Sequence, residues 1–293
     1  NQADIILINN SSLGREAYNL NISKQKITIE SSSSTGLFYA LQSIKSLFKG
    51  LENKSYLPAL EVSDEPRYGY RGFMMDIARN FRDKSVVLKY LDLMAENKLN
   101  VFHFHFIEDE AWRIEIPGLP ELIEVGARRS PLFHLGNALQ PAYGSGIDET
   151  KYYLSRADFI EILKYAKEKH IQVVPEIETP GHARASIKAM EYRYNKYMLA
   201  GDKTAAEEYL LHDLDDKSEY NTAQNFGDNV LNPALPSVYR FLDKVLTEFI
   251  SMYAEAGVPF EKVSLGGDEV PPGVWEKSTK IKALMDKEGM TSV

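Results

Sequence analysis

The sequence contains no cysteine, and this absence removes several kinds of chemistry at once. A chain without thiols forms no disulfides, binds no metal through thiolates and has no cysteine nucleophile. The sequence also has no run of about 18 uncharged apolar residues, so we expect no membrane span. These absences leave a globular protein without thiol chemistry.

Basic residues are not in excess either. The chain has 34 Lys and Arg against 42 Asp and Glu, which gives a formal net charge of -8. Nucleic acid is therefore not an expected partner, because a polyanion needs a basic face. The first four residues carry no basic and apolar leader. We expect a secreted or periplasmic protein, with no signal peptide present in this chain.

Residues 1–65 have the pattern of a small α+β domain, of which this chain holds a part. Short apolar strands are predicted at 4–8 and 25–30, and residues 35–48 carry apolar side chains at helical spacing behind a run of serines. Residues 57–66 contain two prolines and several acids, which predicts a linker.

Residues 66–293 alternate between strands and helices. The predicted strands are 71–77, 99–107, 171–177 and 262–265, and the predicted helices are 84–97, 155–169, 238–254 and 275–287. This alternation favours parallel strands with right-handed crossovers. A closed (β/α)8 barrel has eight such units, so the pattern indicates either a small open α/β sheet or a TIM barrel truncated after about four units. We favour the truncated barrel because polar residues follow every strand.

Two adjacent acids follow the fourth strand. Asp268 and Glu269 come directly after Gly266 and Gly267, and the two glycines allow the backbone to turn or another group to approach. Carboxylates at the carboxyl end of a barrel strand are typical of catalytic residues. A solvated turn after a core strand is the alternative.

The other strands are followed by further polar groups. Arg79 follows the first strand, where it would bind a polyol or carboxylate or pair with Asp76. His103 and His105 share one face of the second strand, which is a known metal-ligand arrangement. The phenylalanines that alternate with them favour a packed layer instead.

The third strand ends in a second group of acids. Glu176 and Glu178 share one face, and a Pro-Gly turn then presents His182 at the same end of the sheet. A histidine in that place can orient a neighbouring carboxylic acid.

In their order and spacing, five segments resemble the β-N-acetylhexosaminidases of glycoside hydrolase family 20. They are Arg71-Gly72-Phe73-Met74-Met75-Asp76 with Arg79, Leu99-Asn100-Val101-Phe102-His103-Phe104-His105, Trp112-Arg113, Pro175-Glu176-Ile177 with Pro180-Gly181-His182, and Gly266-Gly267-Asp268-Glu269. The resemblance covers residues 67–275. Two positions depart from the usual pattern: Glu108 stands where aspartate is frequent, and Ser264 where a histidine commonly precedes the glycines.

The resemblance implies a catalytic role for the adjacent acids. Glu269 would protonate the glycosidic oxygen and later activate water. Asp268 would hold the substrate's acetamido nitrogen while the acetamido oxygen attacks the anomeric carbon, which is substrate-assisted retention. Successive residues of a strand point to opposite faces, so a division of roles between the two acids also fits the sequence.

The resemblance also implies how the sugar is bound. Arg79 would bind hydroxyls of the terminal sugar, and His182 would link an acid of the second-strand loop to Glu269. Glu108 aligns with that acid, and Asp109 is a second candidate for the same place.

The expected partners are glycans that contain N-acetylhexosamine, and no metal or cofactor is expected. The pocket residues that later strands supply in this family are missing, so we expect this fragment to be inactive alone and to self-associate through its open edge. Two alternatives stay open. One is a metal-dependent hydrolase that uses His103, His105, His182 and a carboxylate, and the other is a sugar-binding protein without catalysis.

Overall fold

The computed structural model describes residues 4–51, 56–143, 145 and 148–293. Residues 1–3, on which the expectation about a leader rests, lie outside this range. The described chain forms two compact units. The first comprises residues 1–73, 88–102 and 165–172, and the second comprises 74–87, 103–164 and 173–293.

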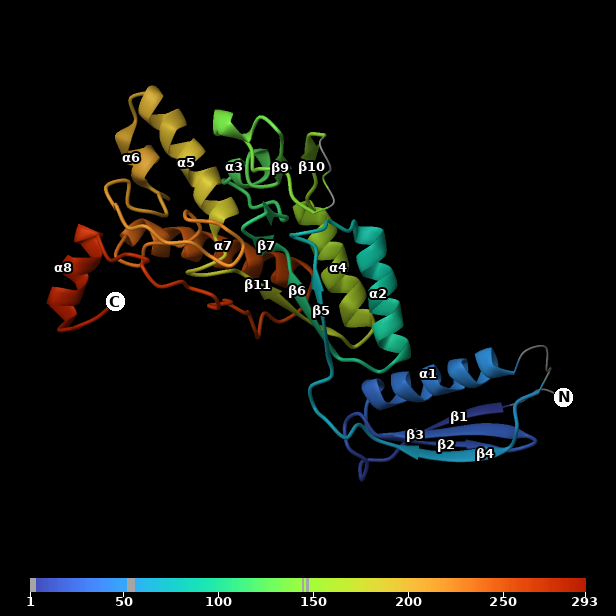
Figure 1. Ribbon diagram of the computed structural model, residues 1–293. Coiled ribbons are helices and arrows are strands. Elements are labelled where there is room, and N and C mark those ends of the chain that lie inside the picture. Colours follow the sequence, from blue (N-terminus) through green and yellow to red (C-terminus); the bar gives the residue numbers. More distant parts are fainter. Residues whose placement is uncertain (1–3, 52–55, 144, 146–147) are drawn as a thin grey trace. The chain divides into compact units, whose positions relative to one another are not determined.

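The first unit contains a four-stranded sheet in the order β1-β3-β2-β4 (Figure 1). Its strands are β1 (Asp4–Asn9), β2 (Tyr18–Ile22), β3 (Lys26–Ser31) and β4 (Leu60–Asp64). β1 runs parallel to β3, whereas β2 is antiparallel to both β3 and β4. The strands predicted at 4–8 and 25–30 are thus confirmed. The linker predicted at 57–66 is wrong, because all five residues of β4 pair with β2.

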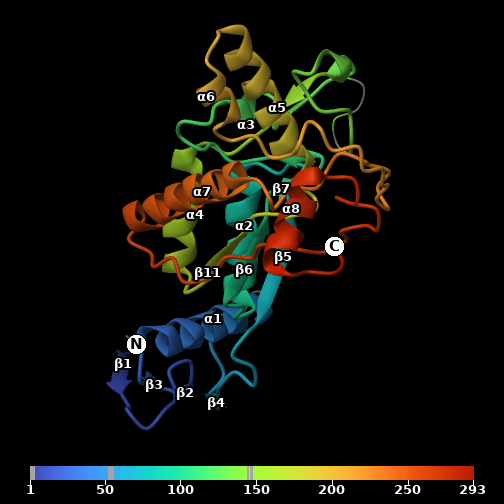
Figure 2. The same cartoon turned by 90° about the vertical axis from the view of Figure 1, so that its left-hand side faces the viewer.

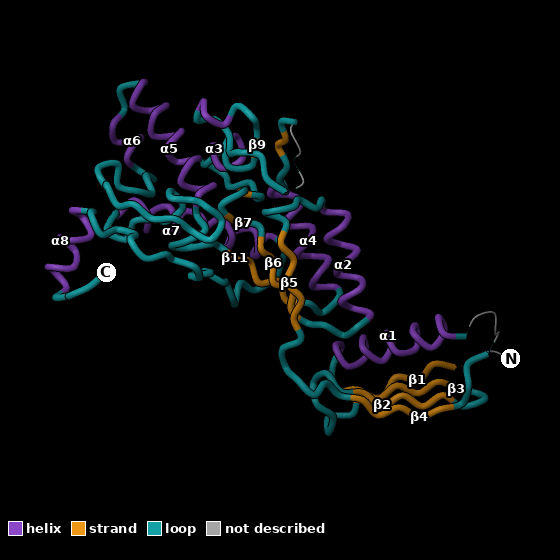
Figure 3. Tube along the Cα trace, in the orientation of Figure 1, coloured by secondary structure: helices purple, strands orange, loops and turns teal. Residues whose placement is uncertain are grey.

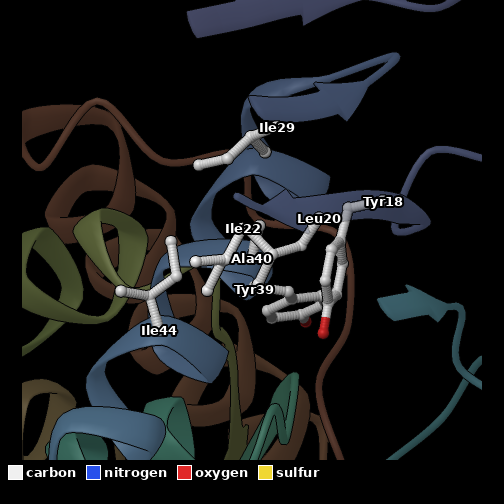
Figure 4. Packing of buried hydrophobic residues seen from close by; sticks show 7 residues of the cluster. All are labelled: Tyr18, Leu20, Ile22, Ile29, Tyr39, Ala40 and Ile44. Carbon is white, nitrogen blue, oxygen red and sulfur yellow. The ribbon is translucent and has the colours of Figure 1, made fainter. Parts of the chain in front are cut away.

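One helix, α1 (Ser34–Gly50), packs its inner face on this sheet. It begins where the serine run predicts, because the Ser33 side chain accepts hydrogen bonds from the backbone N–H groups of Thr35 and Gly36. The core between sheet and helix is a cluster of buried side chains (Figure 4): Tyr18, Leu20, Ile22, Ile29, Tyr39, Ala40 and Ile44.

A second sheet contains three strands in the order β11-β6-β5 (Figure 3). They are β5 (Gly72–Asp76), β6 (Val101–His105) and β11 (Gln172–Glu176), which confirms three of the four strands predicted after residue 66.

The fourth predicted strand, 262–265, is not a strand in the structure. Only Ser264 forms a bridge, parallel to Glu176 of β11. Three backbone hydrogen bonds join this segment to β11 and the residues that follow it, for example from Ser264 N to Pro175 O at 2.9 Å. The ladder ends there because Gly266 and Gly267 turn the chain away, with φ angles of 63° and 100°.

Four helices were expected after residue 66, and all four occur. They are α2 (Lys84–Glu96), α4 (Arg156–Glu168), α7 (Pro236–Glu255) and α8 (Thr279–Glu288). The last begins four residues later than the predicted range of 275–287, because the Ser278 side chain caps it. In the part of the chain that the structure describes, no helix is apolar over enough length to cross a membrane.

In the first unit the strand β2 was not predicted. After residue 66, several short elements and one long helix were not predicted. They are β7 (Ile107–Glu108), β8 (Ala111–Trp112), α3 (Glu121–Glu124), β9 (Arg128–Arg129), a 3-10 turn (Phe133–Leu135), β10 (Thr150–Lys151), α5 (Arg184–Leu199) and α6 (Lys203–Glu207). Most of these elements lie in the connections between the predicted strands and helices.

Aromatic side chains form the centre of the second unit. Phe104 and Phe106 pack edge to face with ring centroids 4.9 Å apart. Phe159 of α4 and Phe249 of α7 join them at 5.5 Å from each other, so these two helices lie side by side (Figure 2). The packed phenylalanine layer predicted for the second strand is present, and its rings anchor the end of β6 from which His105 projects.

Candidate active site

Arg79 occupies a turn that begins where β5 ends. Asp76 accepts backbone hydrogen bonds from Ala78 and Arg79 at 2.8 and 3.1 Å, which fixes the turn. The guanidinium pairs with Asp76 Oδ2 at 3.1 Å, with Glu110 Oε2 at 3.2 Å, and with Glu108. Burial alone would lower the pKa of Arg79, but the three carboxylates more than offset it and the pKa is raised. Arg79 therefore carries a permanent charge.

His182 lies between buried and exposed carboxylates. Its Nδ1 is 3.1 Å from Glu108 Oε1 and 3.3 Å from Asp109 Oδ2, at ion-pair distance but without the geometry of a hydrogen bond. On the other side, its Nε2 is 3.3 Å from Glu269 Oε2 and 3.9 Å from Asp268 Oδ2. Its contacts with Asp109 and Glu108 raise the pKa of His182 to about 11. The imidazole is therefore protonated at neutral pH.

Glu108 and Asp109 form the buried side of this arrangement, with exposures of 1% and 0%. Burial opposes the charge of Glu108, but His105, His182 and Arg79 lower its pKa to about 2. Asp109 accepts a hydrogen bond from Asn229 Nδ2 at 2.9 Å. It also accepts one at 3.1 Å from the first backbone N–H of α5.

A second group of charges surrounds His105. Its Nδ1 contacts Glu176 and lies 3.7 Å from Glu178 Oε1. Burial opposes the charged ring, yet contacts with Glu108 and Glu176 raise the pKa of His105 to about 9. Burial likewise opposes the charge of Glu176, while His105 and Ser264, which donates at 2.8 Å, lower its pKa to about 2.

Glu178 is a buried acid whose negative charge is not sufficiently compensated by the positive groups near it. It is 4% exposed, and its Oε2 has no hydrogen-bond partner among the described residues. Burial and the charge of Glu176 raise its pKa to about 7. The carboxyl packs against the Gly266 backbone, where a Cβ would lie 1.9 Å from Glu178 Oε2. Position 266 therefore has to be glycine both for this contact and for its positive φ.

The two acids of the glycine turn are open to solvent, with side-chain exposures of 66% for Asp268 and 51% for Glu269. The turn packs against the Pro-Gly turn, since a Cβ at Gly181 would lie 3.0 Å from the Asp268 carbonyl oxygen. Gln224 donates a hydrogen bond of 2.7 Å to Glu269 Oε2. Glu269 is held in a left-handed backbone conformation, with φ of 52°.

The structure thus brings together all six residues singled out for catalysis and sugar binding. Sequence reasoning missed three others that contact them: Glu110, Gln224 and Asn229. Glu110 could have been found, because it continues the acidic run after β7. Gln224 and Asn229 lie between α6 and α7 in a segment without periodicity, and no sequence signal indicates them.

Two of the three histidines of the metal alternative, His105 and His182, belong to separate groups. His105, Glu176 and Glu178 could place one ligand atom each within 4.8 Å of one another, and so could Glu108, Asp109 and His182. His103 belongs to neither group, although its Nε2 is 3.0 Å from Glu176 Oε2. In the second group the His182 charge faces Glu108 and Asp109, whereas in the first group His105 pairs with Glu176 and leaves Glu178 without sufficient compensation.

Comparison with known families adds to this geometry. The model "Glycosyl hydrolase family 20, catalytic domain" matches residues 68–293, and "Glycosyl hydrolase family 20, domain 2" matches residues 1–65. The chain belongs to glycosyl hydrolase family 20. Its family-20 relatives include an N,N'-diacetylchitobiase of Vibrio harveyi, 45% identical over 257 residues, which cover 86% of this chain and 29% of the relative. A beta-hexosaminidase of Vibrio furnissii is 38% identical over 99% of the chain and 43% of its own length.

A solved family-20 structure has the same fold. A GH20 exo-beta-N-acetylglucosaminidase of Vibrio harveyi, in complex with N-acetylglucosamine, superposes with a TM-score of 0.84 at 34% identity. The match covers 98% of this chain and 41% of that one. The chain thus spans less than half the length of these relatives.

Proposed function

We propose that this chain carries the catalytic acids of an exo-β-N-acetylhexosaminidase that hydrolyses terminal β-linked GlcNAc or GalNAc. One observation carries the proposal: the protonated His182 ring lies between the buried Glu108 and Asp109 and the exposed Glu269. Such a ring holds the acid in place and stabilises its carboxylate after proton transfer. In this role Glu269 protonates the glycosidic oxygen and then activates water.

Asp268 takes a different part in the reaction. It is the neighbour of Glu269 on one turn, and both acids lie on the same side of His182, so they are poorly placed to flank a glycosidic bond. We assign Asp268 to the acetamido nitrogen of the substrate, whose own acetamido oxygen then attacks the anomeric carbon with retention. Arg79, anchored by three carboxylates, would bind hydroxyls of the terminal sugar.

The proposal includes the architecture of the complete protein. Residues 1–65 would form part of a small α+β domain, and residues 66–293 would form the first half of a (β/α)8 barrel. The bridge at Ser264 supports this reading, because a further strand could extend the sheet beyond it. The isolated 293 residues would then expose a sheet edge and self-associate without turning over substrate.

The test compares the complete gene product with the isolated chain on a chromogenic β-GlcNAc glycoside. We expect turnover from the complete protein and none from the isolated chain, which should elute as oligomers in size-exclusion chromatography with light scattering. Wild-type-like turnover by an isolated monomer would contradict the half-barrel assignment.

Asp268→Ala in the complete protein tests the chemistry. It should remove the preference for 2-acetamido over 2-hydroxy glycosides, because the acetamido group is no longer held for attack. A complete protein that binds GlcNAc but never cleaves it would support the sugar-binding alternative instead. Loss of activity with chelator, together with stoichiometric metal in elemental analysis, would support the metal-dependent one.

A further inference from the structure

Two buried arginines of the second unit have no carboxylate at ion-pair distance among the residues that the structure describes. Arg113 and Arg129 are each 1% exposed, and neither forms an ion pair with any described residue. Burial lowers the pKa of both guanidiniums, and for Arg113 the nearby charge of Arg129 contributes to a pKa of about 9. The nearby carboxylates, Asp76 for both and Glu110 for Arg129, offset this effect only in part. A buried charge without a counter-ion in direct contact is costly, so these two side chains need a further compensating interaction.

That interaction is with backbone carbonyls of the turn that carries Arg79. Ala78 O accepts three guanidinium hydrogen bonds, from Arg113 Nη2 at 3.0 Å, Arg113 Nε at 3.3 Å and Arg129 Nη2 at 2.7 Å. Arg79 O accepts a further hydrogen bond from Arg129 Nη2 at 3.1 Å. The two guanidiniums therefore hold the carbonyl groups of this turn. The Asp76 carboxylate accepts hydrogen bonds from its N–H groups.

The Nη1 atoms of the two guanidiniums donate to backbone carbonyls of the segment between β9 and α4. Arg113 Nη1 donates to Tyr152 O at 2.8 Å, and Arg129 Nη1 donates to Tyr143 O at 2.7 Å. Arg129 lies on β9, which pairs with β10, so its backbone is fixed as well.

Arg129 also holds the backbone of an ion-pair partner of Arg79. Its Nε donates to Glu110 O at 2.9 Å, and the Glu110 carboxylate is 3.2 Å from Arg79 Nε. One side chain thus fixes the main chain on both sides of the Arg79–Glu110 pair.

We propose that Arg113 and Arg129 are positioning residues for Arg79, and that Arg129 sets where the Arg79 guanidinium stands in the sugar pocket. This inference rests on the proposed function, because it assigns Arg79 to substrate binding. A lysine keeps the charge at either position, but its single nitrogen cannot reach the set of carbonyls that a planar fork reaches. The arginine geometry, rather than the charge, is what the turn requires.

The experiment uses Arg129→Lys and Arg113→Lys in the complete protein, with Arg128→Lys as matched control. Arg128 precedes Arg129 on β9 but pairs with the exposed Glu149 at 2.8 Å. We expect KM for a β-GlcNAc glycoside to rise about 10-fold or more in both test variants while kcat changes little, because Arg79 binds substrate and transition state alike. The control should match the wild type.

A double-mutant cycle separates positioning from general damage to the fold. If Arg129 acts through Arg79, adding Arg129→Lys to Arg79→Ala should cost nothing further in KM. Additive losses, or an unchanged KM in both lysine variants with wild-type melting temperatures, would overturn the inference.

The side-chain NMR signal of Arg79 Nε–H gives a readout without turnover. It should shift in Arg129→Lys and stay in place in Arg128→Lys. If the wild type hydrolyses nothing but the signal responds in this way, the proposed function fails and the positioning role stands. If the wild type is active and the signal does not respond, the positioning role fails.

Discussion

The candidate site has a buried half and an open half. Glu108, Asp109 and His182 are almost fully enclosed, and each of these charges faces an opposite charge. Asp268 and Glu269 keep more than half of their side-chain surface in solvent. Enclosed charges need partners because burial without compensation is costly, whereas water solvates the open acids. Changes in the buried half should therefore alter stability and its pH dependence, and changes in the open half should alter turnover alone.

The largest expected effect tests the open half. Glu269→Gln in the complete protein should lower kcat/KM about 10²- to 10⁴-fold on substrates with poor leaving groups, because general acid catalysis is lost. The free energy of unfolding should change by less than about 0.5 kcal/mol, since the side chain is exposed. Steady-state kinetics and urea denaturation measure the two quantities. Glu276→Gln, an exposed glutamate outside the site, is the control and should change neither.

A change in the buried half should lower stability, which the change at Glu269 should not. His182→Gln leaves Glu108 and Asp109 enclosed without the imidazolium, and we expect a loss of about 3 kcal/mol in unfolding free energy at pH 6. Urea denaturation of the complete protein measures this, with exposed His134→Gln as the control. Equal stability of the two variants would remove the distinction between the halves.

The pH dependence of that loss has a definite sign. The folded pKa of His182 is about 11, above the ordinary value of 6.5. Its stabilising contribution is therefore complete below pH 6.5 and disappears as the pH rises toward 11. The contribution of Glu108, whose pKa falls from 4.5 to about 2, is complete above pH 4.5 and disappears toward pH 2. The penalty of His182→Gln should shrink as the pH rises above 6.5.

The smallest effect concerns Glu178, the buried acid without enough compensation. Its pKa is raised from 4.5 to about 7 in the folded protein. Between pH 4.5 and 7 the unfolded chain loses this proton while the folded protein keeps it, so the stability present below pH 4.5 is lost over this range. Glu178→Gln mimics the protonated acid and should leave stability unchanged at pH 4. At pH 8 it should stabilise the fold by about 1 to 3 kcal/mol. Thermal melts at both pH values test this, and a stability gain that is the same at pH 4 and pH 8 would contradict it.

Sequence reasoning indicated which polar residues lie close together better than it indicated the short elements around them. Residues that follow successive strands of one sheet share an edge, so the cluster of Arg79, His182 and Glu269 could be expected from strand order alone. Gln224 and Asn229 could not, because they reach the site through tertiary folding of a loop without periodicity. The same limit applies to any residue whose place depends on loop conformation.

Two errors in the elements have local causes. The strand β4 was missed because its acids and flanking prolines are typical of a linker, although pairing with β2 along its whole length overrides that preference. The helix α5 was missed because it begins after Ala183, which offers no side-chain cap, and because its buried residues do not form a clear stripe. In both cases, tertiary contacts supply what the local sequence lacks.

The left-handed backbone at His182 and Glu269 has a consequence for how this protein can change. Residues with side chains avoid φ angles of 50° and 52°, which cost of order 1 kcal/mol each. Glycine would adopt both angles without strain. At position 182 it would also remove the imidazolium from Glu108 and Asp109, so only at the exposed Glu269 should loss of the side chain favour a more robust fold. The persistence of Glu269 in a lineage would therefore be a sign of selection on the reaction itself, and a paralogue with glycine at position 269 would be one that has abandoned it.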